Sequence, residues 1–323
     1  MSEISAAIGF NLIVISPTIA LVGTALVLLF FTITIESNET VKKSITLIGM
    51  LITSFCVFLK FGLFLENGVS SYFTQKILLD EFSLFGNVLI SLILFFNFLP
   101  IWDSSKQLKE KTTEAIILIL MSASGFMLMI DSENLIMLFI GLEIGSISLY
   151  ALAGLNRGDK LSNEASLKYF LLGSLASCIL IYGVSLVYVS FSVFSVYNFA
   201  LGLAYVGPDS VPLTTSIGVL LIFIGLLFKI AAAPFQSWAP DVYQGSPTGY
   251  VGFMSSIAKA SSFIVIARLC LVSINFIIED FNIFFLIVII SSALIGSLFA
   301  SIQEDLKRLL AYSGVVQLSL IHI

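Results

Sequence analysis

Charged residues are scarce in this chain of 323 residues, where Asp, Glu, Lys and Arg together make up 11%. A soluble globular domain carries about 25% charged residues. Hydrophobic residues account for 58% of the sequence, and the mean hydropathy is +1.08. A water-soluble core could not bury that much apolar surface. Lipid is therefore expected to be the main solvent of the chain.

Residues that hold metals or perform nucleophilic catalysis are also scarce. The three cysteines, Cys56, Cys178 and Cys270, each lie alone in an apolar run, and His322 is the only histidine. This usage argues against zinc, haem, disulfide and catalytic-triad chemistry. The N-terminus, MSEISAAIGF, lacks the basic region of a cleavable signal. The net charge of −5 and the lack of a basic patch argue against a nucleic-acid partner.

Arginine is rare as well, with three residues against 29 phenylalanines. This usage is typical of a membrane protein encoded in an AT-rich genome. It is compatible with an organellar gene and leaves a bacterial host open.

Long apolar runs dominate what is present. A helix needs roughly 20 apolar residues to cross the hydrocarbon core. Nine runs satisfy this, at about 8–35, 43–65, 82–102, 113–130, 132–155, 165–192, 213–238, 249–275 and 281–301. A tenth begins near Arg308 and is still running at Ile323, and the irregular stretch 193–212 is expected to be a short re-entrant or surface loop. The fold class is therefore an all-α polytopic membrane protein with about ten transmembrane helices.

Basic residues divide unequally between the two sides of these spans. The odd-numbered loops carry nine, namely Lys42, Lys43, Lys106, Lys109, Lys111, Arg157, Lys160, Lys307 and Arg308. The N-terminus and the even-numbered loops carry only Lys76. Lys and Arg are enriched on the cytoplasmic or matrix side. The N-terminus is therefore expected on the opposite side, which is the intermembrane space in a mitochondrion.

Ionisable residues inside the predicted spans are the candidates for function. They are Glu143, Lys168, Lys229, Lys259 and Arg268. A charge at mid-membrane costs roughly 2.5–3.5 kcal/mol even on the mild insertion scale, and such residues often mark proton or ion paths. A carboxylate and a lysine that pair there each alter the other's proton affinity, which suits a proton relay. The alternative is a set of fixed ion pairs, and we expect Lys60, near a helix end, to extend to the membrane surface.

The stretch LLFKIAAAPFQSWAPDVYQGSP, residues 226–247, breaks the seventh span. Pro234 removes a backbone donor and clashes with the carbonyl four residues earlier. A proline kink is common in membrane helices, but a break five residues after Lys229 favours a functional break on a hydrated path. WAPDVYQGSP is then the turn between the seventh and eighth helices.

Four segments, in order, resemble one family. IGLEIGSISLYALAG, SNEASLKYFLLGSLAS, FKIAAAPFQSWAPDVYQGSP with the following SSIAKASSF, and EDLKRLLAYSGVVQLSL are similar to the antiporter-like membrane subunits of respiratory complex I. The form WAPDVYQGSP is closest to the chain 2 branch of NADH:ubiquinone oxidoreductase. Mrp-type cation/proton antiporters more often carry a WLPxAHxxAP-like segment there. The resemblance covers nearly the whole chain.

The resemblance implies a function and assigns roles to residues. Glu143, Lys229 and Lys259 resemble the glutamate and lysines of a proton relay, and Lys168 resembles the lysine of the sixth-helix KYF motif. The implied function is proton pumping coupled to quinone reduction, in a mitochondrial inner or bacterial plasma membrane. NADH, FMN, iron–sulfur clusters and ubiquinone would be bound elsewhere in the complex, with no cofactor in this chain. The implied partners are other membrane-arm subunits, including neighbouring antiporter-like chains, together with lipids.

Two features depart from the family pattern. Gln236 stands in PFQSW where members often have histidine, and glutamine does not titrate. The family usually has fourteen helices with two inverted five-helix repeats. This sequence then divides into three N-terminal helices (1–110), a first repeat with the broken helix (111–275) and the start of a second (276–323). The remaining helices could come from a separate polypeptide, which we favour, belong to a longer chain, or have been lost.

Two alternative functions remain open from the residues. One is a Mrp-like cation/proton antiporter subunit. The other is a structural membrane-arm subunit whose buried charges form fixed ion pairs without a proton path.

Overall fold

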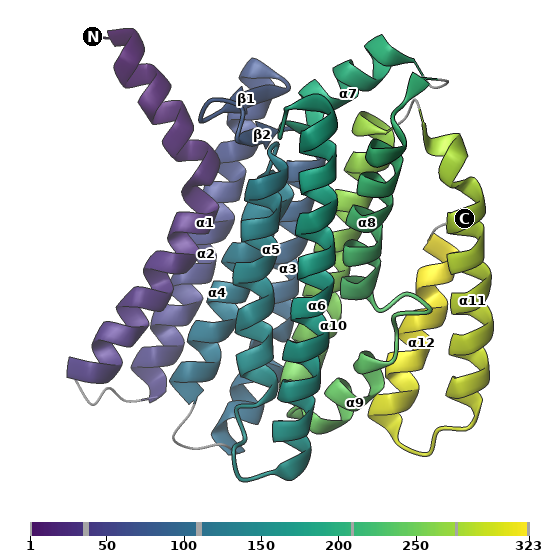
Figure 1. The fold of residues 1–323 in the computed structure, drawn as a ribbon. Helices are drawn as coiled ribbons and strands as arrows, with labels where there is room; N and C mark the ends of the chain where they lie inside the picture. The colour runs from purple at the N-terminus through teal and green to yellow at the C-terminus, as the bar shows by residue number, and fades with distance from the viewer. Residues whose placement is uncertain (1, 35–38, 108–111, 208–209, 275–276, 322–323) are drawn as a thin grey trace. The chain divides into compact units, whose positions relative to one another are not determined.

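The computed structural model describes residues 2–34, 39–107, 112–207, 210–274 and 277–321. The chain divides into two compact units. The first unit comprises residues 1–152 and 252–265, and the second comprises residues 153–251 and 266–323. Figure 1 labels the helices and strands.

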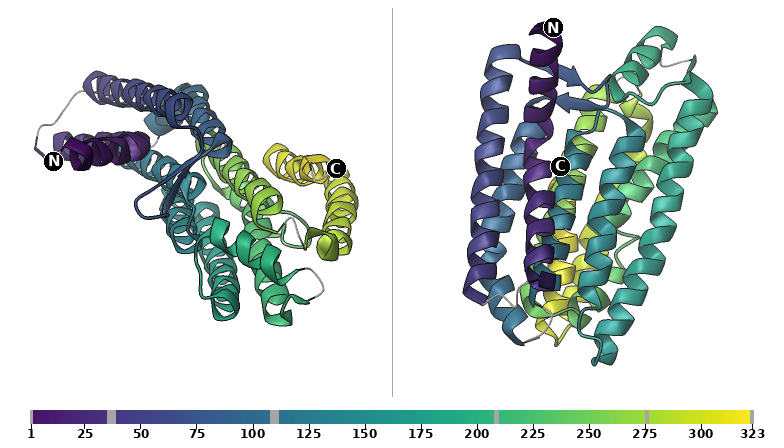
Figure 2. Two further views of the ribbon diagram at one scale, coloured as in Figure 1. Left: turned by 90° about the horizontal axis from the view of Figure 1, so that it is seen from above. Right: turned by 90° about the vertical axis from the view of Figure 1, so that its left-hand side faces the viewer.

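The first unit is a helical bundle with a small hairpin at one end. Its elements are α1 (Ser2–Thr34), α2 (Glu39–Asn67), β1 (Ser70–Tyr72), β2 (Ile77–Leu79), α3 (Glu81–Gln107), α4 (Thr112–Asp131), α5 (Leu135–Ala153) and most of α10 (Thr248–Arg268). Helices α1 and α3 each pack against α2 and α4, and β2 contacts α3 and α4. The antiparallel strands lie at the end of the helices where the chain begins (Figure 2, right).

The second unit is built around α6 and α8. Its elements are α6 (Lys160–Phe191), α7 (Val196–Val206), α8 (Leu213–Ile230), α9 (Trp238–Gly245), the π-helix η2 (Leu269–Ser273), the 3₁₀-helix η3 (Ile278–Phe281), α11 (Asn282–Ser301) and α12 (Leu306–Ile321). Helix α6 packs along α8, and α9 contacts both α6 and α12. Helix α11 packs along α12. The short helix α9 therefore connects the α6–α8 pair to the α11–α12 pair within this unit.

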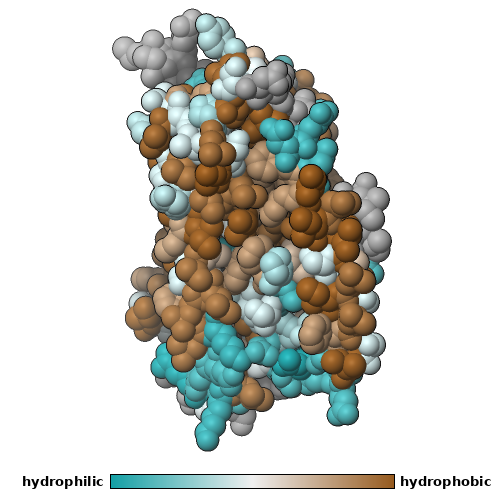
Figure 3. Space-filling model, turned by 45° about the vertical axis from the view of Figure 1, so that its right-hand side comes forward, coloured by the Kyte–Doolittle hydropathy of each residue, from teal (hydrophilic) through white to brown (hydrophobic). Residues whose placement is uncertain are grey.

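The nine full-length membrane spans predicted from the sequence are confirmed. The described residues contain nine helices long and apolar enough to cross a membrane, at Gly9–Thr34, Glu39–Asn67, Glu81–Asp103, Thr112–Asp131, Leu135–Ala153, Lys160–Phe191, Leu213–Ile230, Thr248–Val272 and Glu279–Ser301. Large apolar side chains stay exposed on them, among them Phe58, Phe96 and Leu298. The face drawn in Figure 3 is hydrophobic over its middle, with hydrophilic residues gathered toward the lower end. Such a surface suits contact with lipid.

Helices α6 and α8 approach each other closely through small residues, as membrane helices often do at their contacts. A Cβ atom added to Gly183 of α6 would lie 2.6 Å from the carbonyl oxygen of Gly218 in α8. On the other side of the same contact, a Cβ on Gly218 would lie 2.9 Å from the Gly183 carbonyl oxygen. The tight α6–α8 contact therefore depends on both glycines.

Two predictions about connecting segments are corrected. The segment 193–212 contains the helix α7, which begins where the Ser195 hydroxyl accepts a hydrogen bond from Asn198 N at 3.2 Å. The segment WAPDVYQGSP is not a simple turn, because Trp238–Gly245 forms α9. Pro240 lies in the first turn of α9, where a helix does not need the missing backbone donor.

The expectation that Lys60 extends to the membrane surface is wrong. Lys60 is 0% exposed, and its Nζ lies 2.7 Å from Asp131 Oδ1. Seven residues separate Lys60 from the end of α2 at Asn67, a depth of about 10 Å. The Lys60 ammonium is therefore paired with a carboxylate inside the protein.

Candidate functional site: the broken helix and its buried lysine

The seventh predicted span ends earlier than the sequence suggested. Helix α8 stops at Ile230 instead of continuing to 238, and α9 starts at Trp238. Ala231 caps α8 in the left-handed conformation, with φ 60° and ψ 36°. Pro234 lies in the connection after this cap and follows a cis peptide bond. The helix thus ends at Ile230, four residues before Pro234. In a continuous helix the proline ring would clash with the Ile230 carbonyl.

Protein groups satisfy the backbone that the break exposes. Ala231 N donates to Phe228 O at 3.0 Å, and Trp238 Nε1 donates to the same carbonyl at 3.1 Å. Ala233 N donates to Ser292 Oγ of α11 at 2.9 Å. Ala231 and Ala233 are fully buried. Irregular backbone at membrane depth persists only where such partners replace the helical ones.

Lys229 lies in the last turn of α8, immediately before the break. Its side chain is 3% exposed, and Nζ donates to Ser177 Oγ of α6 at 3.3 Å. The C-terminal end of a helix carries a partial negative charge from its last carbonyls and stabilises a cation there. The break therefore creates a helix end inside the protein that can hold a lysine.

Aromatic rings cover this helix end. The Trp238 ring stacks on Tyr169 of α6, with centroids 4.6 Å apart, and on Phe228 of α8 at 5.6 Å. Tyr243 of α9 meets Trp238 edge-on at 6.4 Å. Burial raises the pKa of the Tyr243 hydroxyl, so this ring stays neutral. The KYF and WAPD motifs, remote in sequence, therefore pack together.

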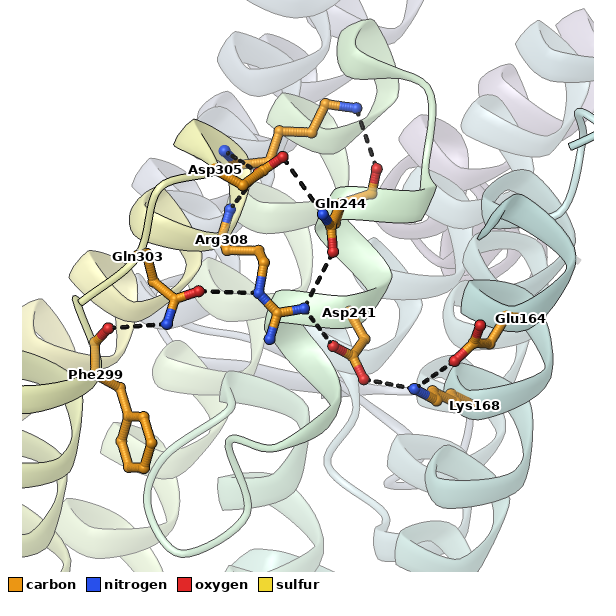
Figure 4. Close-up of polar contacts among 9 residues, drawn as sticks. Glu164, Lys168, Asp241, Gln244, Phe299, Gln303, Asp305 and Arg308 are labelled. Atoms are coloured by element: carbon orange, nitrogen blue, oxygen red, sulfur yellow. Dashed lines mark hydrogen bonds and ion pairs between the residues drawn. The ribbon is translucent and has the colours of Figure 1, made fainter. Parts of the chain in front are cut away.

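Lys168 lies in a polar network at one end of α6. Its Nζ is 2.6 Å from Asp241 Oδ2 and 2.7 Å from Glu164 Oε1 (Figure 4), and its side chain is 40% exposed. Helix α6 begins at Lys160, so Lys168 lies about two turns inside the helix. Nine residues separate Lys168 from Ser177, which places the two on opposite faces of α6. Lys168 therefore points away from the hydroxyl that Lys229 contacts.

Asp241 and Arg308 are the members of this network that the sequence reasoning missed. Arg308 Nη1 is 2.6 Å from Asp241 Oδ1 and 3.1 Å from Gln244 Oε1, and Arg308 Nε donates to Gln303 Oε1 at 3.0 Å (Figure 4). Burial acts to raise the pKa of Asp241, but the hydrogen bonds from Lys168 and Arg308 outweigh it and lower that pKa. The sequence did carry a signal for Asp241, because it is the only acidic residue in the segment WAPDVYQGSP. One carboxylate thus joins α6, α9 and α12.

Glu143 and Lys259 belong to the first unit. Glu143 is the ninth residue of α5, and Lys259 is the twelfth residue of α10, so both lie near mid-helix and are half-buried. Glu143 lies close enough to Tyr150 to act on it electrostatically, and Ser146 hydrogen-bonds Tyr150. Their positions agree with the prediction that both lie inside membrane spans. Lys168, Lys229 and Pro234 belong to the second unit.

The similarity to known proteins covers all the predicted site residues. The family described as NADH:quinone oxidoreductase/Mrp antiporter, TM matches residues 132–323, more than half of the chain. The chain belongs to this family. Glu143, Lys168, Lys229 and Lys259 all lie inside the matched segment, whereas α1 to α4 precede it.

This chain is similar to curated proteins named NADH-quinone oxidoreductase subunit N. The protein of Trichlorobacter lovleyi is 36% identical over 309 residues, which cover 94% of this chain and 62% of the relative. The protein of Flavobacterium psychrophilum is 35% identical over 271 residues, which cover 84% of this chain and 58% of the relative. The chain thus spans about three fifths of these relatives.

Solved structures have the same fold. A chain of respiratory complex I from Thermus thermophilus superposes with a TM-score of 0.76 at 27% identity, covering 95% of this chain and 63% of that one. A chain of the membrane-bound sulfane sulfur reductase, an archaeal respiratory membrane complex, gives a TM-score of 0.79 at 23% identity, covering 94% and 64%. The second likeness shows a shared fold alone. The prediction of an antiporter-like polytopic fold is confirmed.

Replacing Asp241 by asparagine is expected to lower stability by about 1 kcal/mol near neutral pH, because a partly exposed charge-assisted contact is worth little more. A carboxyl whose pKa is lowered by folding stabilises the fold above its unfolded pKa, and this contribution is lost as the pH falls through the lowered value. The difference between wild type and Asp241→Asn should therefore close in acid. Thermal unfolding of the detergent-solubilised chain between about pH 3 and 7 measures it.

Glu164→Gln is the matched control, because it removes the other partner of Lys168 from a more exposed i,i+4 pair. Such pairs contribute only a few tenths of a kcal/mol. A stability gap for Asp241→Asn that stays constant with pH would contradict the assigned role of its charge.

Proposed function

We propose that this chain is a proton-translocating membrane-arm subunit of respiratory NADH:quinone oxidoreductase. The observation that carries the proposal is the buried Lys229 at the end of a broken helix, within the segment that matches the NADH:quinone oxidoreductase/Mrp antiporter family. Lys229 donates to the Ser177 hydroxyl at the C-terminal end of a helix, and a buried lysine changes its proton affinity readily when its surroundings change.

The proposed relay consists of Glu143, Lys168, Lys229 and Lys259. Each of these groups changes its proton affinity when the charge of its surroundings changes. Loss of a nearby positive charge raises the proton affinity of a half-buried carboxylate such as Glu143. Proton transfer then proceeds through Lys259 along a hydrated axis. Lys168 and its partner Asp241 provide titratable groups near the N-terminal end of α6.

The finer identity within the family is also a proposal. The similarity to proteins named subunit N supports the chain 2 branch. The bacterial origin of the relatives favours a plasma membrane over the mitochondrial inner membrane. The excess of Lys and Arg in the odd-numbered loops supports a topology with those loops on the cytoplasmic side and the N-terminus opposite. NADH, FMN, iron–sulfur clusters and the quinone bind other subunits of the complex, and neighbouring membrane-arm subunits are the partners of this chain.

Affinity purification of the tagged chain from its native membrane tests the assembly. We expect subunits that carry flavin and iron–sulfur clusters, and NADH:quinone reductase activity, to purify with it. A Mrp-like antiporter subunit would instead purify with other membrane chains that carry no redox groups. The third outcome is that the redox subunits purify with the chain, but a variant without Lys229 pumps protons normally. That outcome would favour a structural subunit over a proton-pumping one.

A further inference from the structure

A recess lies between α2 and α3 on the surface of the first unit. Its volume is about 320 Å³. It is lined by Ser54 and Val57 of α2 and by Val88, Ser91, Leu92 and Phe95 of α3. Val88, Leu92 and Phe95 are each about half exposed, so the recess opens to the outside of the bundle. Both helices are membrane spans, and the medium at this depth is lipid.

The wall of the recess is apolar in character. The Ser54 hydroxyl donates to the Met50 carbonyl of its own helix at 3.0 Å, and the Ser91 hydroxyl donates to the Asn87 carbonyl at 2.8 Å. The other lining side chains carry no polar atoms. A polar occupant would lose its hydrogen bonds to water without replacing them. The recess therefore fits a hydrocarbon segment.

The size of the recess favours a lipid chain over a protein helix. An α-helix with its side chains is about 10–12 Å across, so a piece about 10 Å long occupies roughly 800 Å³ or more. The recess, at about 320 Å³, does not admit it. An acyl chain is a single file of methylene groups and has no backbone polar groups to satisfy. Such a chain suits a narrow recess between two helices.

A lysine lies at one end of the same helix contact. Lys43 Nζ of α2 is 5.9 Å from the ring centroid of Phe98 and 5.8 Å from that of Trp102, both in α3. Lysine and tryptophan are typical of the level of the lipid headgroups. Lys43 is half-buried, whereas the carboxylates at this end, Glu39 and Asp103, are exposed. The charged group over the α3 rings is thus an ammonium.

The spacing between Lys43 and the recess matches one leaflet of a bilayer. Lys43 and Ser54 are eleven residues apart in α2, and Ser91 and Trp102 are eleven residues apart in α3. Eleven helical residues span about 17 Å. Half of the hydrocarbon core is about 15 Å thick. An acyl chain whose headgroup lies at Lys43 therefore ends near the recess.

The contact between α2 and α3 is also incompletely filled over that distance. A second cavity, of about 20 Å³, is lined by Thr46, Met50, Leu94, Phe98, Ile101 and Trp102 of these helices and by Ile116, Ile119 and Leu120 of α4. On the outer side, Leu51 of α2 and Leu99 of α3 are exposed and apolar. An acyl chain that follows the contact would have hydrocarbon on both sides.

We propose that α2 and α3 bind one phospholipid, with its phosphate at the Lys43 ammonium and one acyl chain in the recess. Basic groups between membrane helices bind lipid headgroups in this way. The other acyl chain remains in the bilayer. The site lies before residue 132, where the family match begins, and includes none of the relay residues.

Photo-crosslinking of the full chain in phosphatidylglycerol vesicles locates the lipid. The probe is phosphatidylglycerol with a photoreactive diazirine near the end of one acyl chain, at a low mole fraction. We expect labelling to concentrate in residues 51–57 and 88–95. The exposed faces of α6 and α11 report labelling by bulk lipid. Labelling of the recess that is no stronger than on those faces would overturn the proposal.

Competition distinguishes a phospholipid from any apolar filler. Unlabelled phosphatidylglycerol should displace the probe from the recess. A diacylglycerol with the same acyl chains should compete about tenfold less well, because it has no phosphate for Lys43 and loses a charge-assisted contact. Equal competition by the two lipids would contradict the assignment of the phosphate to Lys43.

Two variants test the two ends of the site. Ser91→Leu fills the recess, and Lys43→Met removes the ammonium, and each should reduce recess labelling about tenfold. Their matched controls are Ser185→Leu on an exposed face of α6 and Lys160→Met at the start of α6, which should label as wild type. Unchanged labelling in either test variant would overturn the proposal.

Two further safeguards keep the test decisive. If Ser91→Leu does not elute as wild type in size-exclusion chromatography, Lys43→Met and the competition still decide the matter. A second copy of the chain or another membrane helix on this face would block recess labelling in the wild type, which would also overturn the proposal. Failure of this site would leave the proposed proton relay unaffected, because lipid labelling does not depend on proton movement.

Discussion

Replacing Lys229 by methionine is expected to reduce proton pumping per NADH oxidised through this subunit by roughly 100-fold or more, the usual loss when a proton-transferring group is removed. The physical reason is that methionine fills the same buried space beside Ser177 without a titratable nitrogen. Proton uptake by membrane vesicles that contain the assembled complex measures the effect. NADH oxidation by an artificial acceptor depends only on the redox subunits and should be unchanged.

Lys229→Arg separates charge from proton transfer. Arginine keeps a cation at the end of α8 but does not release its proton in a protein. We expect this variant to assemble and to pump as poorly as Lys229→Met. Lys76→Met, which removes an exposed lysine of the hairpin, is the matched control and should pump normally. Full pumping in Lys229→Arg would show that only the charge is needed and would contradict the relay.

Replacing Trp238 by alanine is expected to destabilise the chain by about 3–5 kcal/mol, the usual cost of deleting a buried tryptophan. The indole is 2% exposed, stacks on Tyr169 and Phe228, and donates to the Phe228 carbonyl at the break. Loss of all three contacts should loosen the end of α8 that holds Lys229. Thermal unfolding of the detergent-solubilised chain measures the change.

Trp238→Phe retains an aromatic ring and removes the Nε1 donor. Its expected cost is about 1–3 kcal/mol, because the Phe228 carbonyl loses a partner in an apolar setting. Tyr205→Ala, at a side chain that is 94% exposed, is the control and should leave stability nearly unchanged. If Trp238→Phe is as stable as wild type, the indole hydrogen bond does not support the break.

The membrane spans could be predicted from the sequence because lipid imposes a simple requirement. Each span must satisfy its own backbone and present apolar side chains over roughly 20 residues. The same requirement made Lys229, Glu143 and Lys259 stand out, since a charge inside such a run is costly. Pro234 marked the break because proline cannot continue a helix. All of these signals are local in the chain.

The partners of the charges could not be predicted, because they are remote in sequence. Lys60 was expected at the membrane surface, yet Asp131, 71 residues later, holds it inside the first unit. Lys168 was grouped with the buried lysines, yet its ammonium is paired with Asp241, 73 residues away, at an exposed end of α6. The position of Ser292 beside the break likewise depends on the packing of α11.

The sequence by itself determined the family, the number and approximate bounds of the apolar helices, and the position of the break. It did so because hydrophobic length, proline and buried charge act within a single segment. Only the tertiary structure decided which carboxylate neutralises each lysine, which groups satisfy the broken helix, and that α2 and α3 leave a recess between them. Those outcomes depend on distances between helices, which are fixed by side-chain packing and not by any one helix alone.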